Sequence, residues 1–202
     1  MGSLGNAPDL WYDEEQQPEI LNSKVVRMDL CSAPLELLPL EGLRLGDQLL
    51  PLSASKEQAE ALLGPAEEFQ GDQWYYAESE LRLDFDQSGR LEFIEFLGGL
   101  EGKLQPTIYG LPAFQTGADE LAQALTRYND GPVDDHEQGR SYAFLNISVG
   151  IYRSILPQDV RELIAEMEEN GIPTRGNPDV ERDRRRAEHW ETIGIGAAGY
   201  YQ

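Results

Sequence analysis

One stretch of the chain decides its fold class: residues 73–94 have the sequence QWYYAESELRLDFDQSGRLEFI. Large apolar side chains alternate in it with polar ones, which is typical of half-buried β-strands, and Gln87-Ser88-Gly89-Arg90 interrupts the alternation with a turn. Upstream, Ser55 and Gln58 have the spacing of a capping box, and apolar residues follow at helical intervals until Gly64-Pro65. The sequence therefore predicts a helix that leads into an antiparallel meander.

The same order of elements recurs later in the chain. Thr116 and Asp119 predict the start of a second helix, which is followed by a second alternating stretch. Four apolar pairs link the two stretches, each pair separated by 68 positions: Trp74/Tyr142, Tyr76/Phe144, Leu81/Val149 and Leu83/Ile151. We interpret this constant offset as an internal duplication and assign the main extra length of the second copy to residues 129–139.

The chain is therefore expected to be an α+β protein, in which two tandem helix-plus-antiparallel-meander repeats form a sheet with helices on one face. Its acidic, proline-containing start predicts a flexible arm, and the rest is expected to be one domain. The predicted ranges are 1–19 for the arm, 20–202 for the domain, about 45–97 for repeat one, about 109–155 for repeat two, and 157–202 for C-terminal helices and a tail that ends as a strand or a docked segment.

Charge restricts the partners. The chain has 37 acidic and 16 basic residues, a formal charge of −21 at pH 7. This charge repels phosphate backbones and anionic lipids, so we expect neither nucleic acid nor a membrane as partner. A protein that is basic, or that itself binds an anion, is favoured. Solubility alone is the other explanation of the charge.

The cysteine count and the N-terminal sequence bear on the compartment. Cys31 is the only cysteine in the sequence, which excludes an intramolecular disulfide and a cysteine-built zinc site. The first residues have neither the cationic nor the apolar run of a secretory signal. We therefore expect a cytoplasmic protein.

The sharpest local pattern has the spacing of an EF-hand calcium loop and contains Asp84, Asp86, Ser88 and Glu95. An EF-hand needs a helix on each side, whereas the residues on both sides of this pattern alternate as in strands, and Gly98-Gly99 breaks the second helix. We favour a β-hairpin that turns at Ser88, with calcium as the alternative. No metal site is predicted.

We find no catalytic constellation in the sequence. The only histidines, His136 and His189, have no recognisable nucleophile or orienting partner, and carboxylates are too abundant to indicate a site. No glycine-rich loop connects a strand to a helix in the manner of a phosphate site. The arginines of residues 182–186 alternate with acids and are expected to form ion pairs. No cofactor and no enzymatic activity are expected.

A resemblance to known bacterial families implies a function for the chain. Leu45-Gly46-Asp47, the helix that ends at Leu62-Leu63-Gly64-Pro65, residues 74–76 and residues 83–94 together resemble a small unit of the outer-membrane-assembly lipoproteins, found as a tandem pair in beta-lactamase inhibitory protein. The ending, residues 190–201, resembles the C-termini of proteins encoded beside polymorphic toxins as their immunity proteins. The resemblance implies an inhibitor that covers the active site of a toxin domain. The signal and acylated cysteine of the lipoproteins are not found here.

The expected fold suggests where such a partner binds. Helices on one face leave the other face of the sheet free, and aromatic and arginine side chains are the usual anchors of protein interfaces. The residues predicted to bind the partner are Tyr75, Arg82, Asp84 and Tyr152 on that face and Asp134, Asp135 and Glu137 on an acidic loop that enters a basic cleft. Two other classes stay open: a structural or scaffold protein with an exposed apolar patch, and a hydrolase with a deep pocket that holds carboxylates of perturbed pKa.

Overall fold

The computed structural model describes residues 30–202 of the chain, so the predicted arm at residues 1–19 and the predicted start of the domain up to residue 29 lie outside the described part. The larger of two sheets has eight antiparallel strands in the spatial order β10 (Val133–Asp134), β11 (Ser141–Phe144), β12 (Val149–Tyr152), β13 (Thr192–Gly196), β7 (Leu91–Phe96), β6 (Leu81–Phe85), β5 (Gln73–Tyr76) and β4 (Glu68–Gln70). The smaller sheet has the order β3 (Gln48–Pro51), β2 (Gly42–Leu45), β1 (Leu35–Leu38), β8 (Thr107–Ile108) and β9 (Leu111–Pro112). The helices are α1 (Lys56–Leu63), α2 (Ala118–Asn129), α3 (Pro157–Glu169) and α4 (Pro178–Ala187), with a 3₁₀ turn at Gly99–Glu101.

The larger sheet consists of two equivalent halves. Each half is a helix followed by four strands: α1 precedes β4 to β7, and α2 precedes β10 to β13. Trp74 pairs with Leu83 in the first half, and Tyr142 pairs with Ile151 at the same position of the second. The α+β class, with helices on one face of the sheet, is confirmed.

The two halves meet at the centre of the sheet. Leu83 pairs with Ile94 within the first half, as Ile151 pairs with Ile193 within the second, so Ile94 and Ile193 are counterparts. Across the junction of β7 and β13, Ile94 faces Ile195 and Ile193 faces Phe96. Because the counterparts of two paired residues are themselves paired, the two halves are related by an approximate two-fold axis that lies between β7 and β13.

Local sequence explains the elements. Ser55 and Gln58 form the predicted capping box at the start of α1, because each side chain bonds the backbone N–H of the other residue. The hairpin between β6 and β7 turns at Ser88-Gly89, as predicted, with Gly89 at φ +76°. Alternate strand residues point into a single core, which the smaller sheet, α1 and α2 complete.

Three details differ from the sequence predictions. The second helix starts at Ala118 with Gly117 as its N-cap, so Thr116 does not begin it. Tyr128 shares a helical spacing with Leu121 and Leu125, which predicts one common face; the two leucines are buried, but Tyr128 is exposed and stacks on Tyr109. The main insertion of the second half is residues 153–191, which contain α3 and α4, between β12 and β13; the first half has only residues 86–90 there. The last pair matched at the 68-residue offset is Leu83/Ile151, so the comparison of the two stretches did not extend to the insertion that begins at residue 153.

The predicted tail strand has a structural role that the sequence did not indicate. As β13 it lies between β12 and β7 and so joins the two halves. Just before it, the indole of buried Trp190 donates a hydrogen bond to the carbonyl of Ala118 over 2.9 Å. The tail therefore closes the sheet and ties it to α2.

Candidate partner-binding face

A row of residues crosses all eight strands on the face that points away from α1 and α2. Because strand residues alternate between the faces, the neighbours of the buried core residues form this open face. Pairing across the sheet brings together Glu68, Tyr75, Arg82, Glu95, Gly194, Gly150, Ala143 and Asp134. The first half of the row has charged and aromatic side chains, whereas the second half has the small residues Gly194, Gly150 and Ala143 before it ends at Asp134.

Arg82 organises the first half of the row. Its guanidinium lies 3.1 Å from Glu95 and 3.0 Å from Asp84, although the second contact is not aligned as a hydrogen bond. Thr192 donates a hydrogen bond to the other Glu95 oxygen over 3.0 Å. Burial raises the pKa of Glu95, and Arg82 opposes this rise. Burial lowers the pKa of Arg82, but attraction to both carboxylates outweighs burial and raises it.

Two tyrosines from the end of the sequence fill the second half of the row. The ring of Tyr200 stacks on Phe93 with centroids 4.5 Å apart. Tyr201 lies over Gly150, where an added Cβ would be 2.1 Å from the tyrosine hydroxyl. Burial, and next the charge of Glu95, raise the pKa of Tyr201. Sequence reasoning missed these tyrosines; the signal for them was Gly150 and Gly196 inside otherwise apolar strands, because Tyr201 lies over Gly150 and Tyr200 lies over Gly196.

A groove of about 410 Å³ lies over this face, between the tyrosines and the acidic loop, which we define as residues 134–140. Residues from both halves of the sheet line this groove. The charged and aromatic side chains at its walls are Arg82, Phe93, Glu95, Asp134, His136, Glu137, Tyr142, Tyr152, Tyr200 and Tyr201. Tyr152 and Tyr200 are 39% and 38% exposed, so the groove offers aromatic rings to a partner.

The residues predicted to bind a partner divide into groups. Arg82, Asp134, Glu137 and Tyr152 meet at the groove. Tyr75 and Asp84 lie on the same face farther along the sheet; the Tyr75 hydroxyl donates to Gln73, and Asp84 is buried beside Arg82. Asp135 lies on the acidic loop outside the groove, in a neighbouring hollow with Val133 and Leu145.

The acidic loop is held by its own carboxylates. Asp134 accepts the backbone N–H of His136 over 3.0 Å and also contacts its ring, and Asp135 accepts the N–H of Gly139 over 2.6 Å. His189 instead contacts the carbonyl of Arg185. The imidazole of His136 is almost fully exposed, so the His136–Asp134 pair is not sheltered in the way that a catalytic base is held.

The residues that have the spacing of an EF-hand loop make the contacts of a β-hairpin instead. Asp86 accepts hydrogen bonds from the Ser88 N–H and hydroxyl and from the Arg90 N–H, which lower its pKa. Glu95 instead contacts Arg82. Within residues 30–202, no group of three or more histidine, cysteine or acidic side chains is arranged to hold a metal ion.

Comparisons with protein-family models, with curated proteins and with solved structures find no match for this chain. The helices of residues 30–202 include none with the length and apolar character needed to cross a bilayer.

Proposed function

We propose that this chain is a non-catalytic immunity protein, which binds a bacterial toxin domain through the open face and the acidic loop and thereby covers the toxin's active site. The observation that carries the proposal is the groove over the open face, where exposed Tyr152 and Tyr200 lie beside the carboxylates of Asp134 and Glu137. Aromatic anchors surrounded by polar groups are typical of protein interfaces. The charge of −21 favours a cationic partner or one that binds an anion.

Growth rescue tests the proposal. The toxin domain encoded beside the gene of this chain is expressed in a bacterial host with and without the chain, and binding of the two purified proteins is measured by calorimetry. We expect restored growth and a Kd below about 1 μM. Tyr152→Ala should weaken the complex, whereas Glu120→Gln, on the exposed start of α2, should not. Absence of a complex at about 10 μM of each protein would overturn the proposal.

A hydrolase is the second candidate, because Glu95 combines a raised pKa with a place in a groove. Both of its carboxylate oxygens have partners, Arg82 and Thr192, which favours a structural role. The variant Glu95→Gln separates the two candidates. A hydrolase that uses this carboxyl as proton donor loses its activity, whereas neutralisation of a toxin needs no proton transfer and is at most weakened through the place of Glu95 in the groove.

A further inference from the structure

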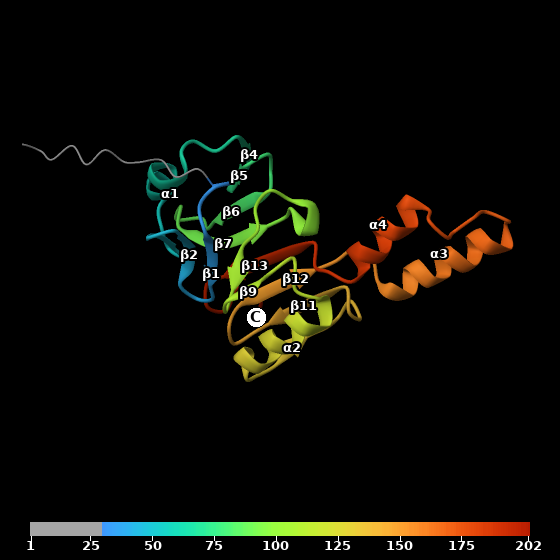
Figure 1. Cartoon of the computed structure of the whole chain (residues 1–202). Helices are drawn as coiled ribbons and strands as arrows, with labels where there is room; N and C mark the ends of the chain where they lie inside the picture. The colour runs from blue at the N-terminus through green and yellow to red at the C-terminus, as the bar shows by residue number, and fades with distance from the viewer. Residues whose placement is uncertain (1–29) are drawn as a thin grey trace, which may run out of the picture.

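The insertion of the second half forms a projecting helical hairpin, Pro157–Ala187, which consists of α3 and α4 (Figure 1). It extends away from both sheets, and Val160 is the only buried residue of α3. Apolar residues of α3 recur at helical spacing as Val160, Leu163, Ile164 and Met167, yet none of them belongs to the main hydrophobic core. Val160 and Ile164 lie beside Arg184 and Ala187 of α4, so packing between the two helices explains part of this apolar side but leaves Leu163 exposed.

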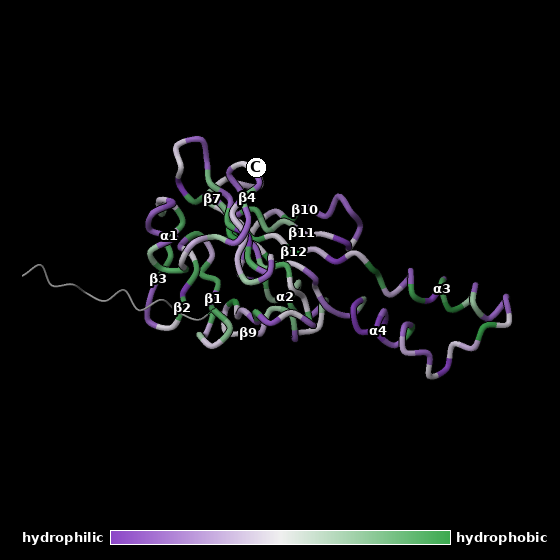
Figure 2. The backbone as a smooth tube through the Cα atoms, turned by 90° about the horizontal axis from the view of Figure 1, so that it is seen from above, coloured by the Kyte–Doolittle hydropathy of each residue, from purple (hydrophilic) through white to green (hydrophobic). Residues whose placement is uncertain are grey.

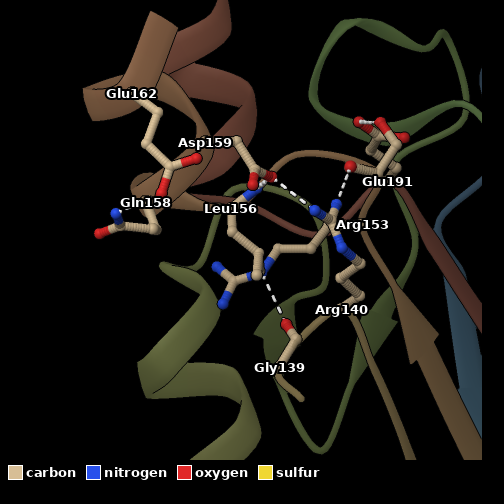
Figure 3. A network of polar contacts seen from close by, with 9 residues as sticks. Gly139, Arg140, Arg153, Leu156, Gln158, Asp159, Glu162 and Glu191 are labelled. Atoms are coloured by element: carbon tan, nitrogen blue, oxygen red, sulfur yellow. Dashed lines mark hydrogen bonds and ion pairs between the residues drawn. The ribbon is translucent and has the colours of Figure 1, made fainter. Parts of the chain in front are cut away.

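The base of the helical hairpin is fixed beside the acidic loop. Arg140, the last residue of that loop, donates a hydrogen bond to Asp159 of α3 over 2.8 Å (Figure 3). On the other side of the base, Glu191 accepts hydrogen bonds from Ser154 over 2.7 Å and from Arg186 over 2.9 Å. These contacts place the helical hairpin next to the proposed interface and continuous with it.

The two helices differ in charge. The predicted pairing of the α4 arginines with neighbouring acids is confirmed for Arg182, which pairs with Asp179, and for Arg184, which pairs with Glu181. Arg185 and Arg186 pair instead with Glu101 and Glu191, which lie outside the helix. On α3, in contrast, Glu162, Glu166, Glu168 and Glu169 form no ion pair with any residue in the described part of the chain. Arg161 and Arg175 also have no ion pair in the described part of the chain, but the four glutamates outnumber them, so the uncompensated charge of the helical hairpin is net negative and is concentrated on α3.

An apolar strip runs through these glutamates. Leu163 is 38% exposed, and half-buried Met167 is four residues further on, on the same side of the helix. The helix ends at Glu169, and Gly171 follows with a φ of +71°, which lets the N–H of Ile172 donate a hydrogen bond to the carbonyl of Met167 over 2.8 Å. Ile172 is 48% exposed. Figure 2 shows the apolar positions along α3 and the hydrophilic α4 beside it.

We propose that this strip, with Glu162, Glu166 and Glu169 around it, docks a cationic amphipathic segment of the same toxin domain. The inference rests on the proposed function and adds a second contact to it. A surface that is both apolar and negative is complementary to one that is apolar and positive. A second copy of α3 would bring like charges together, so self-association does not fit.

The test measures binding of the full-length chain to the toxin domain of the rescue experiment, by calorimetry and by association kinetics. One variant is Leu163→Ser/Ile172→Ser, and another is Glu162→Gln/Glu166→Gln/Glu169→Gln. The control, Glu41→Gln/Glu60→Gln/Glu120→Gln, removes the same charge from exposed positions outside the open face. Circular dichroism and sedimentation of each variant report folding and self-association.

We expect the serine variant to raise Kd about tenfold to a hundredfold, chiefly through faster dissociation, and the α3 glutamine variant to slow association more than its control does. If the wild-type chain binds but the serine variant binds equally well, the inference about the helical hairpin is wrong and the proposed function stands. A wild-type dimer that the serine variant dissociates would also overturn it, because the strip would then be a self-interface. If the wild-type chain does not bind the toxin domain, both proposals fail.

Discussion

The guanidinium of Arg153 lies 4.8 Å from the centre of the Trp190 ring. Arg153 is 7% exposed, and it donates hydrogen bonds to the carbonyl of Gly139 over 3.0 Å and to that of Ala187 over 2.8 Å. Burial lowers its pKa. A single buried side chain directly after β12 thus joins the acidic loop, the end of α4 and the start of the segment that leads into β13.

Removal of the Arg153 side chain should lower the stability of the fold. Arg153→Ala leaves two carbonyls without their donor, so we expect a loss of about 3 kcal/mol in the free energy of unfolding. Urea denaturation measures it. The control is Arg161→Ala on the exposed surface of α3, for which we expect a change within about 0.5 kcal/mol. Equal losses for the two variants would contradict a structural role of Arg153.

Gly150 makes room for Tyr201. In Gly150→Ala the new Cβ would meet the tyrosine hydroxyl, so the ring must shift, and we expect a loss of about 1–2 kcal/mol in the free energy of unfolding. A double-mutant cycle tests this: in a Tyr201→Ala background, Gly150→Ala should cost little. An unchanged cost in that background would mean that the strain has another source.

The raised pKa of Glu95 predicts a pH dependence of stability. A carboxyl whose pKa is higher in the folded than in the unfolded chain stabilises the fold at pH values below its unfolded pKa, and this contribution is lost as pH rises through the folded pKa. The stability of the wild type relative to Glu95→Gln should therefore fall as pH rises from about 4 towards neutrality. Urea denaturation across that range measures the difference. A difference that grows with pH would mean that attraction to Arg82 outweighs burial.

The hairpin at Ser88 should not act as a calcium site. The carboxylate of Asp86 accepts hydrogen bonds within the turn, and that of Glu95 forms an ion pair with Arg82. Neither residue lies beside the helices that an EF-hand requires. We expect calorimetric titration with calcium to show no sub-micromolar binding. Sub-micromolar binding that disappears in Asp84→Ala would prove the hairpin interpretation incomplete.

The acidic loop should steer association with the toxin domain. Replacing Asp134 and Asp135 by Asn and Glu137 by Gln removes charge while leaving acceptors for the hydrogen bonds within the loop. We expect slower association and a weaker dependence on salt, because opposite charge can raise association rates about tenfold to a thousandfold at low salt. Stopped-flow kinetics across a salt series measures both. Salt-independent association of the wild type, unchanged by the triple replacement, would contradict steering.

Tyr75 gives the matching test on the open face. If it is an anchor of the interface, Tyr75→Ala should speed dissociation and cost about 2 kcal/mol of binding free energy, with little effect on association. Loss of association rate without faster dissociation would place Tyr75 outside the interface core.

Local pattern alone predicted many elements of this fold. The capping box at Ser55 and the hairpin at Ser88 are examples, because each is decided by residues within a few positions of one another. The 68-residue offset predicted which residues of the two halves share a position, because side-chain alternation fixes strand register.

What the sequence could not determine depends on contacts between distant residues. Nothing near Thr192 indicates that β13 takes the central position in the sheet, since that place is defined by pairing with β7 and β12. The apolar stripe of α3 looks like any core-facing stripe, because periodicity shows that a helix has an apolar side but not what covers it. Only the tertiary structure decided that Trp190 enters the core while Leu163 stays exposed, because burial depends on what the folded chain places against a side chain.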